Sequence, residues 1–223
     1  MNTTPEFHNV LAWGEDKARL TSIQHKFLKY FPEGGRILDI GSGRGFFLEL
    51  LAENGYIPEG IDMDPTMQKV SAEQGFTVHT SDALTFLKST NKQYDGIFAS
   101  HIIEHMPIDD GIEFIRLIKQ HLAPGGVAII ITPRPGSLWA TENFWLDTTH
   151  VRPYPYELMK KYFTEFELLV GGIEPDSNPV LHPSKKKRLA LAFRRVLFGA
   201  ELFDFVYGGG VSYIVAKKPL PKK

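Results

Sequence analysis

Short runs of β-branched and other apolar residues alternate with helical patterns along roughly the first 130 residues. In one helical pattern Phe47, Leu50 and Leu51 recur at i, i+3 and i+4, so they share one face of a helix. Asp64 and Pro65 are the residue types favoured at an N-cap and at the first helical position. The pattern predicts strands at Arg36–Ile40, Ile57–Asp62, Phe76–His79, Tyr94–Ser100 and Val127–Ile131, and helices at Asp16–Phe31, Phe46–Asn54, Pro65–Gln74, Ala83–Leu87 and Asp110–Leu122.

Strands that alternate with helices are joined by right-handed crossovers, which gives a parallel sheet covered by helices on both faces. Val127–Ile131 is apolar at every position, as expected of a central strand that is buried on both faces. The sequence therefore predicts a doubly wound α/β fold. We expect Thr132–Pro155 to be irregular, followed by a helix at Tyr156–Tyr162 and by strands at Phe166–Gly172 and Val211–Ala216.

Composition narrows the class of protein. The chain has 223 residues, of which 43% are hydrophobic and 23% charged, as is typical of one soluble globular domain with appendages. The absence of cysteine excludes a disulfide scaffold, a cysteine-ligated metal and a thiol nucleophile. Met1 to Val10 lacks the features of a secretory signal, and charges interrupt every candidate for a spanning helix, so we expect a cytoplasmic protein.

The formal net charge of -1 conceals two oppositely charged parts. Residues 1–181 carry 15 basic and 24 acidic side chains, whereas residues 182–223 carry 10 basic and two acidic ones. Six of the basic residues fall in Ser184–Phe198, where a helical insertion could contact an anionic membrane surface peripherally. The alternative is a helix packed on the sheet or over a binding pocket. One basic helix on a nearly neutral chain gives no reason to expect nucleic acid as a partner.

Candidate chemistry begins at Gly41, Gly43 and Gly45, which follow the first predicted strand and open the first helix of the sheet unit. Glycines let the backbone approach a ligand closely, and a helix N-terminus offers N–H groups. A dinucleotide-binding G-x-G-x-x-G loop would need glycine where Phe46 stands, and no Walker A loop is present. The loop therefore suits a smaller zwitterion, with its carboxylate on the loop N–H groups and its ammonium near Asp39.

Three acids, Asp39, Asp62 and Asp82, stand at or near the ends of three successive predicted strands. The carboxyl edge of a doubly wound sheet is where its ligands bind. Asp62 is placed to accept both hydroxyls of a ribose, and Asp82 to reach an adenine edge. The alternative is that Asp39 and Asp62 only cap neighbouring loops, which would be the better explanation of any single aspartate. The regular spacing of all three acids favours a ligand.

The segments ILDIGSGRG, GIDMDP, SDAL, YDGIFASHIIEH and LAPGG-VAIII resemble, as an ordered set over about Gly35 to Pro133, class I S-adenosylmethionine-dependent methyltransferases of types 11 and 12. The resemblance implies a Rossmann-like, mostly parallel seven-stranded sheet with an antiparallel last strand, and S-adenosylmethionine as the cofactor. It also implies one domain over residues 1–223, with a helical cap at 1–34, a cofactor core at 35–133 and an acceptor region at 134–223. The implied cofactor-binding residues are Asp39, Gly41, Ser42, Gly43, Gly45, Asp62, Met63, Asp82, Ala83 and Ser100.

A second motif, His101-Ile-Ile-Glu104-His105, has the H-x-x-E-H pattern of inverted zinc peptidases. Pro107 ends any helix almost at once and no further ligand presents itself, which argues against a peptidase. The motif also resembles the E-x-x-E-H of ubiquinone-pathway O-methyltransferases, which is associated with a divalent cation, although His101 replaces the first acid. The alternative, which we favour, is that Glu104 and His105 fix the loop by hydrogen bonds and that no metal is bound.

Methyl transfer to a hydroxyl usually requires a base, and histidine is the usual choice because its pKa lies near neutrality. The candidate bases are His101, His105 and His150. His150 lies in Asn143–Tyr154, a segment too polar for a core strand and too aromatic for a plain linker. The candidate acceptor-binding residues are Arg134, Trp145, Arg152 and Tyr154, the two arginines as a clamp for an anionic acceptor.

The phrase F-W-L-D-x-T-H-x-R-P-Y-P within this segment resembles methyltransferases of bacterial surface-polysaccharide and lipopolysaccharide assembly. That resemblance implies a sugar or glycan-linked acceptor. The prediction is therefore an S-adenosylmethionine-dependent enzyme that methylates an oxygen of a small molecule or glycan. Three alternatives stay open: a metal-assisted quinol or phenol O-methyltransferase, a non-catalytic module at the inner membrane surface, and a nicotinamide oxidoreductase, against which Phe46 argues.

Overall fold

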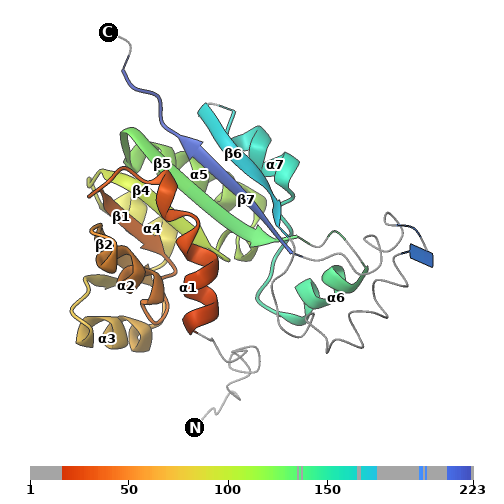
Figure 1. The fold of residues 1–223 in the computed structure, drawn as a ribbon, viewed down its shortest axis with the longest axis horizontal. Coiled ribbons are helices and arrows are strands. Elements are labelled where there is room, and N and C mark those ends of the chain that lie inside the picture. Colours follow the sequence, from red (N-terminus) through yellow and green to blue (C-terminus); the bar gives the residue numbers. More distant parts are fainter. Residues whose placement is uncertain are drawn as a thin grey trace.

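A seven-stranded sheet with helices on both faces forms the body of the molecule (Figure 1). The computed structural model describes residues 17–134, 136, 138–164, 167–174, 196–197, 199 and 210–221. The strands are β1 (Arg36–Ile40), β2 (Ile57–Asp62), β3 (Val78–Thr80), β4 (Tyr94–Ser100), β5 (Leu122–Pro133), β6 (Glu167–Glu174) and β7 (Val211–Lys217).

The strands lie in the order β3-β2-β1-β4-β5-β7-β6. All pairs among β1 to β5 are parallel, whereas β7 is antiparallel to both β5 and β6. This arrangement confirms the mostly parallel, doubly wound sheet with an antiparallel last strand. The sheet order changes direction at β1, where one crossover leads to β2 and a later one to β4, so the carboxyl ends of β1 and β4 border a crevice.

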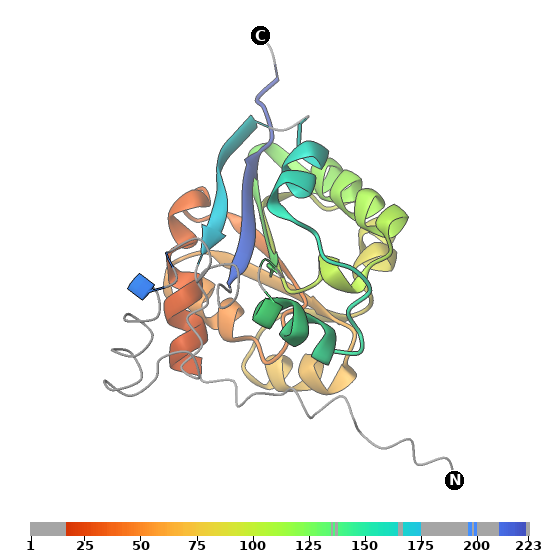
Figure 2. The same cartoon turned by 90° about the vertical axis from the view of Figure 1, so that its right-hand side faces the viewer.

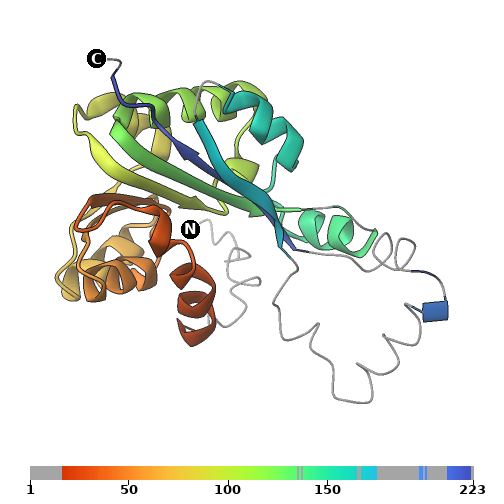
Figure 3. The same ribbon diagram turned by 45° about the horizontal axis from the view of Figure 1, so that its top comes forward.

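The helices form one layer on each face of the sheet (Figures 2 and 3). One layer contains α1, η2, α2 and α3, and the other contains α4, α5 and α7. The helices are α1 (Lys17–His25), η2 (Leu28–Tyr30), α2 (Phe46–Glu53), α3 (Pro65–Glu73), α4 (Ala83–Ser89), η3 (Ile103–His105), α5 (Ile108–His121), α6 (Leu138–Leu146) and α7 (Tyr156–Tyr162).

The apolar strand β5 shows how the two layers are stabilised. Val127, Ile129 and Ile131 pack with η2 and α2, whereas Ala128 and Ile130 pack with α4, α5 and α7. Successive side chains of a strand point to opposite faces, so an uninterrupted apolar run fills both cores. The predicted central position of this strand is confirmed.

Several predicted elements differ from the structure. The strand expected at Phe76–His79 begins two residues later, and β5 extends beyond Val127–Ile131 in both directions. The expectation that Thr132–Pro155 is irregular is wrong, because α6 occupies part of it. This helix exposes Leu138, Trp145 and Leu146, so its sequence lacks the apolar stripe that reveals a packed helix.

The N-terminal helix expected at Asp16–Phe31 is divided into α1 and η2, joined by a turn. Met1 to Val10 lies outside the described residues, as does the predicted insertion Ser184–Phe198 apart from Val196 and Leu197. Among the described residues, no helix is both long and apolar enough to span a bilayer.

Candidate active site

The glycine loop connects β1 to α2 and adopts a conformation that favours glycine. Gly41, Gly43 and Gly45 have φ values of 78°, 50° and 78°, in the left-handed region. A side chain at Gly41 would also collide with Ile102, which follows β4. The loop therefore brings bare backbone close to the crevice at the carboxyl ends of β1 and β4.

The loop amides are bonded within the protein, which corrects one expectation. The N–H groups of Gly41 and Ser42 donate to the Ile61 carbonyl oxygen at 2.8 and 3.0 Å, and the Gly43 N–H donates to Asp62 Oδ2 at 2.8 Å. The Gly45 N–H donates to the Ser42 carbonyl oxygen at 2.9 Å. A ligand carboxylate on these four amides does not agree with this pattern, so their role is to shape the loop.

Asp39 lies at the end of β1 beneath this loop and is buried, with only 4% of its surface exposed. Burial, together with the nearby charge of Asp62, raises the pKa of Asp39 to about 8. A cationic ligand group beside Asp39 would favour the ionised carboxylate.

Asp62 and Asp82 both have structural partners. Asp62 accepts N–H bonds from Gly43 and from Asp64 (2.9 Å), and Asp82 is the N-cap of α4, accepting the Thr85 N–H at 2.9 Å. Hydrogen bonds from Thr85 hold the pKa of Asp82 below its ordinary value. The capping alternative thus describes Asp62, whereas the N-cap role of Asp82 was not predicted. A carboxylate has about four lone-pair sites, so capping leaves capacity for a ligand.

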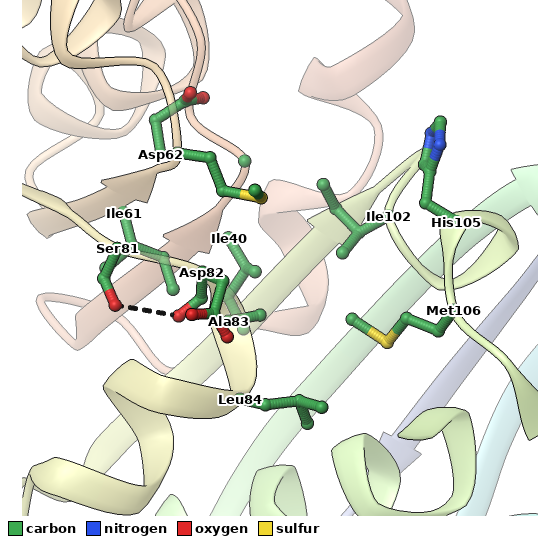
Figure 4. Close-up of a pocket in the computed structure, with 12 residues that line it drawn as sticks. Ile40, Ile61, Asp62, Ser81, Asp82, Ala83, Leu84, Ile102, His105 and Met106 are labelled. Carbon is green, nitrogen blue, oxygen red and sulfur yellow. Dashed lines mark hydrogen bonds between the residues drawn. The ribbon is translucent and has the colours of Figure 1, made fainter. Parts of the chain in front are cut away.

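A cavity of about 330 Å³ opens at this edge of the sheet (Figure 4). His105 and Met106 lie across it from Asp62 and Asp82. The lining residues are Ile40, Gly41, Ile61, Asp62, Met63, Ser81, Asp82, Ala83, Leu84, Ile102, His105 and Met106. Its mostly apolar walls suit a flat ring such as adenine, and its acids suit ribose hydroxyls.

The cavity brings together six of the predicted site residues, which are Gly41, Asp62, Met63, Asp82, Ala83 and His105. Sequence reasoning missed its apolar walls, Ile40, Ile61, Leu84, Ile102 and Met106. Each of these wall residues is adjacent in the chain to a predicted site residue, so proximity to the strand ends was the available signal.

His101 and Glu104, which adjoin the cavity-lining Ile102 and His105 in the chain, form a pair. His101 has φ 59°, the left-handed region that residues other than glycine rarely adopt, and such backbone strain clusters at functional sites. Its Nδ1 lies 3.1 Å from Glu104 Oε1, while Thr132 Oγ1 donates to Glu104 Oε2 at 3.1 Å. Glu104 is fully buried, so both of its carboxylate oxygens have partners in the protein interior.

His105 and His150 meet on the acceptor side. Their ring centroids are 4.8 Å apart, and His150 also packs against Phe144 at 4.4 Å. His150 Nδ1 is 2.7 Å from the Phe144 carbonyl oxygen, which accepts only, so Nδ1 carries the proton and Nε2 of the neutral ring is a base. The carbonyl oxygen of Thr149 similarly lies 3.2 Å from His105 Nδ1.

Asp147 completes this group, because its Oδ2 lies 3.7 Å from His150 Nε2. Burial alone would raise the pKa of Asp147, but hydrogen bonds from Thr149 and the charges of His150 and His105 outweigh burial, and the pKa lies below its ordinary value. Asp147 is therefore ionised at neutral pH. Its charge would stabilise a protonated His150.

Glu104, His105 and His150 are also the residues that could hold a metal. One ligand atom from each lies within 4.8 Å of the others. Two imidazoles and a carboxylate form a donor set suited to a divalent transition metal. This arrangement brings together two parts of the chain that the sequence motif alone did not connect.

The four predicted acceptor residues have different surroundings. Trp145 is 54% exposed on α6, and Arg134 is partly buried beyond β5. Tyr154 is fully buried, which corrects its expected role: its hydroxyl bonds to main-chain carbonyl oxygens in the core instead of facing an acceptor. The Arg152 guanidinium lies 5.2 Å from the centre of the Tyr154 ring.

The sheet order, the glycine loop and the acids along the carboxyl edge together define a Rossmann-like methyltransferase. Residues 12–170 match the family model described as a methyltransferase domain, and the chain belongs to this family. Membership of this family agrees with the S-adenosylmethionine cofactor that the resemblance in the sequence implied.

Three similar proteins illustrate the relationship. A crystal structure of a SAM-dependent methyltransferase from Archaeoglobus fulgidus has a TM-score of 0.73 and 29% identity, covering 91% of this chain and 94% of that one. The N-methyltransferase NodS from Bradyrhizobium japonicum, in complex with S-adenosyl-L-homocysteine, shares the fold at 16% identity, with a TM-score of 0.65 over 93% and 91% of the two chains. A ubiquinone biosynthesis O-methyltransferase from Rickettsia canadensis is 29% identical over 122 residues, which are 51% of this chain and 50% of that protein. The match thus spans about half the length of that relative.

Proposed function

We propose that the protein transfers a methyl group from S-adenosylmethionine to a hydroxyl oxygen of a small-molecule or glycan-linked acceptor, with His150 as the base. The observation that carries the proposal is the fixed tautomer of His150, which leaves Nε2 as a base next to the cavity-lining His105. The similarity to O-methyltransferases and the polysaccharide-type phrase around His150 support an oxygen acceptor.

Each residue of this site has a role in the proposed reaction. The bound cofactor supplies an electrophilic methyl group on a sulfonium. The cavity walls and Asp62 would hold the nucleoside, and Asp39 would face the ammonium group. His150 Nε2 would accept the hydroxyl proton of the acceptor as its oxygen takes the methyl group in place of the sulfonium sulfur. Asp147 then stabilises the imidazolium, and Arg152 and Trp145 contact the acceptor.

The test is a transfer assay with labelled cofactor against sugar, phosphosugar, quinol and phenol acceptors. His150→Gln is expected to lower kcat at least about 100-fold with unchanged cofactor affinity, because it removes the base alone. His121→Gln is the matched control, since the His121 Nδ1 likewise meets a carbonyl oxygen, that of Lys92, but away from the cavity. Loss of transfer activity in His101→Gln, together with wild-type rates in His150→Gln, would show that the base is His101 instead. Wild-type cofactor affinity in Asp62→Ala would contradict the whole site.

A second candidate function is metal-assisted O-methylation of a quinol or phenol, which the proximity of Glu104, His105 and His150 favours. A metal there would lower the pKa of a bound hydroxyl, so that no protein base would be needed. Metal analysis of the purified protein, with activity before and after chelation, separates the two functions. Stoichiometric zinc, manganese or magnesium and loss of transfer on chelation would favour the metal, and full activity without metal would exclude it.

Peripheral contact with the inner membrane surface through residues 184–198 is part of the same proposal, because this segment interleaves basic and apolar residues. It would bring the site to a lipid-linked acceptor from the cytoplasmic side. Vesicle binding without transfer to any acceptor, unchanged in His101→Gln and His150→Gln, would instead favour a non-catalytic module.

A further inference from the structure

Two segments that are distant in the chain are fastened side by side at the candidate active site. The first, residues 104–107, carries His105 and Met106, which line the cofactor cavity. The second, residues 149–154, carries His150 and Arg152, which belong to the proposed acceptor site. A displacement of residues 104–107 would therefore also displace residues 149–154.

Main-chain and side-chain hydrogen bonds make this connection. The N–H groups of Val151 and Arg152 both donate to the Glu104 carbonyl oxygen, at 2.9 and 3.2 Å. His105 Nδ1 bonds to the Thr149 carbonyl oxygen at 3.2 Å. These bonds lie at one end of the paired segments, nearest the histidines.

Tyr154 fastens the other end. Its hydroxyl lies 3.1 Å from the Met106 carbonyl oxygen and 3.0 Å from that of Pro107, so one proton is shared between two acceptors. The side chain is fully buried, where a hydrogen bond meets no competition from water. Its ring also lies beneath the Arg152 guanidinium.

The Tyr154 hydroxyl lies directly against Gly111 of α5. Glycine inside a helix costs about 1 kcal/mol relative to alanine, yet Gly111 lies within α5. A Cβ at this position would overlap the Tyr154 hydroxyl. The glycine therefore leaves the space that the hydroxyl occupies.

We propose that Tyr154 is a positioning residue through which cofactor binding orders the acceptor segment. Contact of a ligand with His105 and Met106 restricts the motion of residues 104–107. The hydrogen bonds of the Tyr154 hydroxyl then restrict the motion of residues 149–154, which include Arg152. The inference rests on the proposed function only for the role of this segment in binding the acceptor. The coupling itself requires no acceptor.

Hydrogen exchange with S-adenosylhomocysteine as the probe tests the coupling. In the wild type the probe is expected to slow exchange of the Val151 and Arg152 amides about tenfold, because their bonds to Glu104 open less often. In Tyr154→Phe this protection should fall to about twofold, with affinity for the probe unchanged. Tyr56→Phe is the matched control, since it removes a hydroxyl bond to the Leu28 carbonyl oxygen on the other face of the sheet, and it should behave as wild type.

Gly111→Ala is the second variant, because it displaces the Tyr154 ring and keeps the hydroxyl. It should reproduce the loss of protection from exchange. The variant that combines Gly111→Ala with Tyr154→Phe should lose no more protection than either single variant. With an acceptor from the transfer screen, Tyr154→Phe should raise the acceptor KM about fivefold and leave kcat and the cofactor KM near wild type. No protection by the probe in the wild type, wild-type protection in Tyr154→Phe, or equal losses of cofactor and acceptor binding would each overturn the proposal. Absence of transfer by the wild type would contradict the proposed function and leave the exchange result to decide the coupling.

Discussion

At the scale of the residue, Asp39 offers the sharpest test of cofactor binding. Its pKa of about 8 in the free protein means that it is mostly protonated at pH 6, whereas an ammonium ligand requires the ionised form. Affinity for S-adenosylhomocysteine is therefore expected to rise between about pH 6 and pH 8. Calorimetric titration at several pH values checks this, and in Asp39→Asn the rise should disappear along with most of the affinity.

Asp39→Asn should gain stability, although it loses cofactor affinity. Because the folded pKa of Asp39 is raised above its unfolded value, ionisation costs stability progressively as the pH rises from about 4 to about 8. Asp39→Asn removes this cost, so its melting temperature should exceed that of the wild type above pH 8 and approach it near pH 4. A constant difference across this range would show that Asp39 is not the titrating group.

Individual site residues were predictable to different degrees. Asp39, Asp62 and Asp82 followed from strand ends alone, because the carboxyl ends of parallel strands meet at one edge. The hydrogen bond from Thr132 to Glu104 was not predictable, since these two residues are 28 positions apart in the chain. Tyr154 was assigned to the acceptor because its burial depends on packing that the sequence does not display.

At the scale of the element, α4 links helix stability to the cofactor site through its N-cap. Asp82→Ala removes the cap and is expected to cost about 1 kcal/mol of unfolding free energy, whereas Asp82→Asn retains an acceptor and costs little. Both variants should weaken cofactor binding if the carboxylate itself contacts the ligand. Denaturant unfolding and calorimetry measure the two effects separately.

Asp64→Ala provides the comparison for α4, because Asp64 caps α3 and does not line the cavity. It should lose similar stability and retain more cofactor affinity. Equal losses of affinity in Asp64→Ala and Asp82→Ala, with wild-type affinity in Asp82→Asn, would show that the cap, and not an adenine contact of the carboxylate, explains the effect of Asp82.

Elements with a clear pattern were predictable and those without one were not. The strand β1 and the helix α7 have the predicted bounds because their apolar positions and flanking residues agree with their packing. The helix α6 was missed because it projects from the end of the sheet, as Figure 3 shows, and exposes large apolar side chains. In such a helix, periodicity carries no information about a core.

At the scale of the whole molecule, the charge is divided between an acidic cofactor-binding part and a basic C-terminal part. Opposite charges on two parts of one chain do not alter the fold, but they determine which surfaces each part approaches. An acidic body is repelled by an anionic bilayer, so any attraction to such a bilayer must come from residues 182–223. The proposed membrane contact is therefore expected to be confined to residues 182–223 and to depend on salt.

Replacing Lys185, Lys186 and Lys187 by glutamine is therefore expected to weaken binding to phosphatidylglycerol vesicles about a hundredfold, at roughly 1 kcal/mol for each charge. Vesicle sedimentation at low salt measures this, and raising the salt from about 50 to 500 mM should release the wild type as screening shortens the Debye length. The matched control replaces the exposed Lys29, Lys69 and Lys161, which gives the same net charge but leaves the basic segment intact. Because only the position of the lost charges differs, equal weakening in both variants would assign binding to net charge alone, and retention in the control would assign it to residues 184–198.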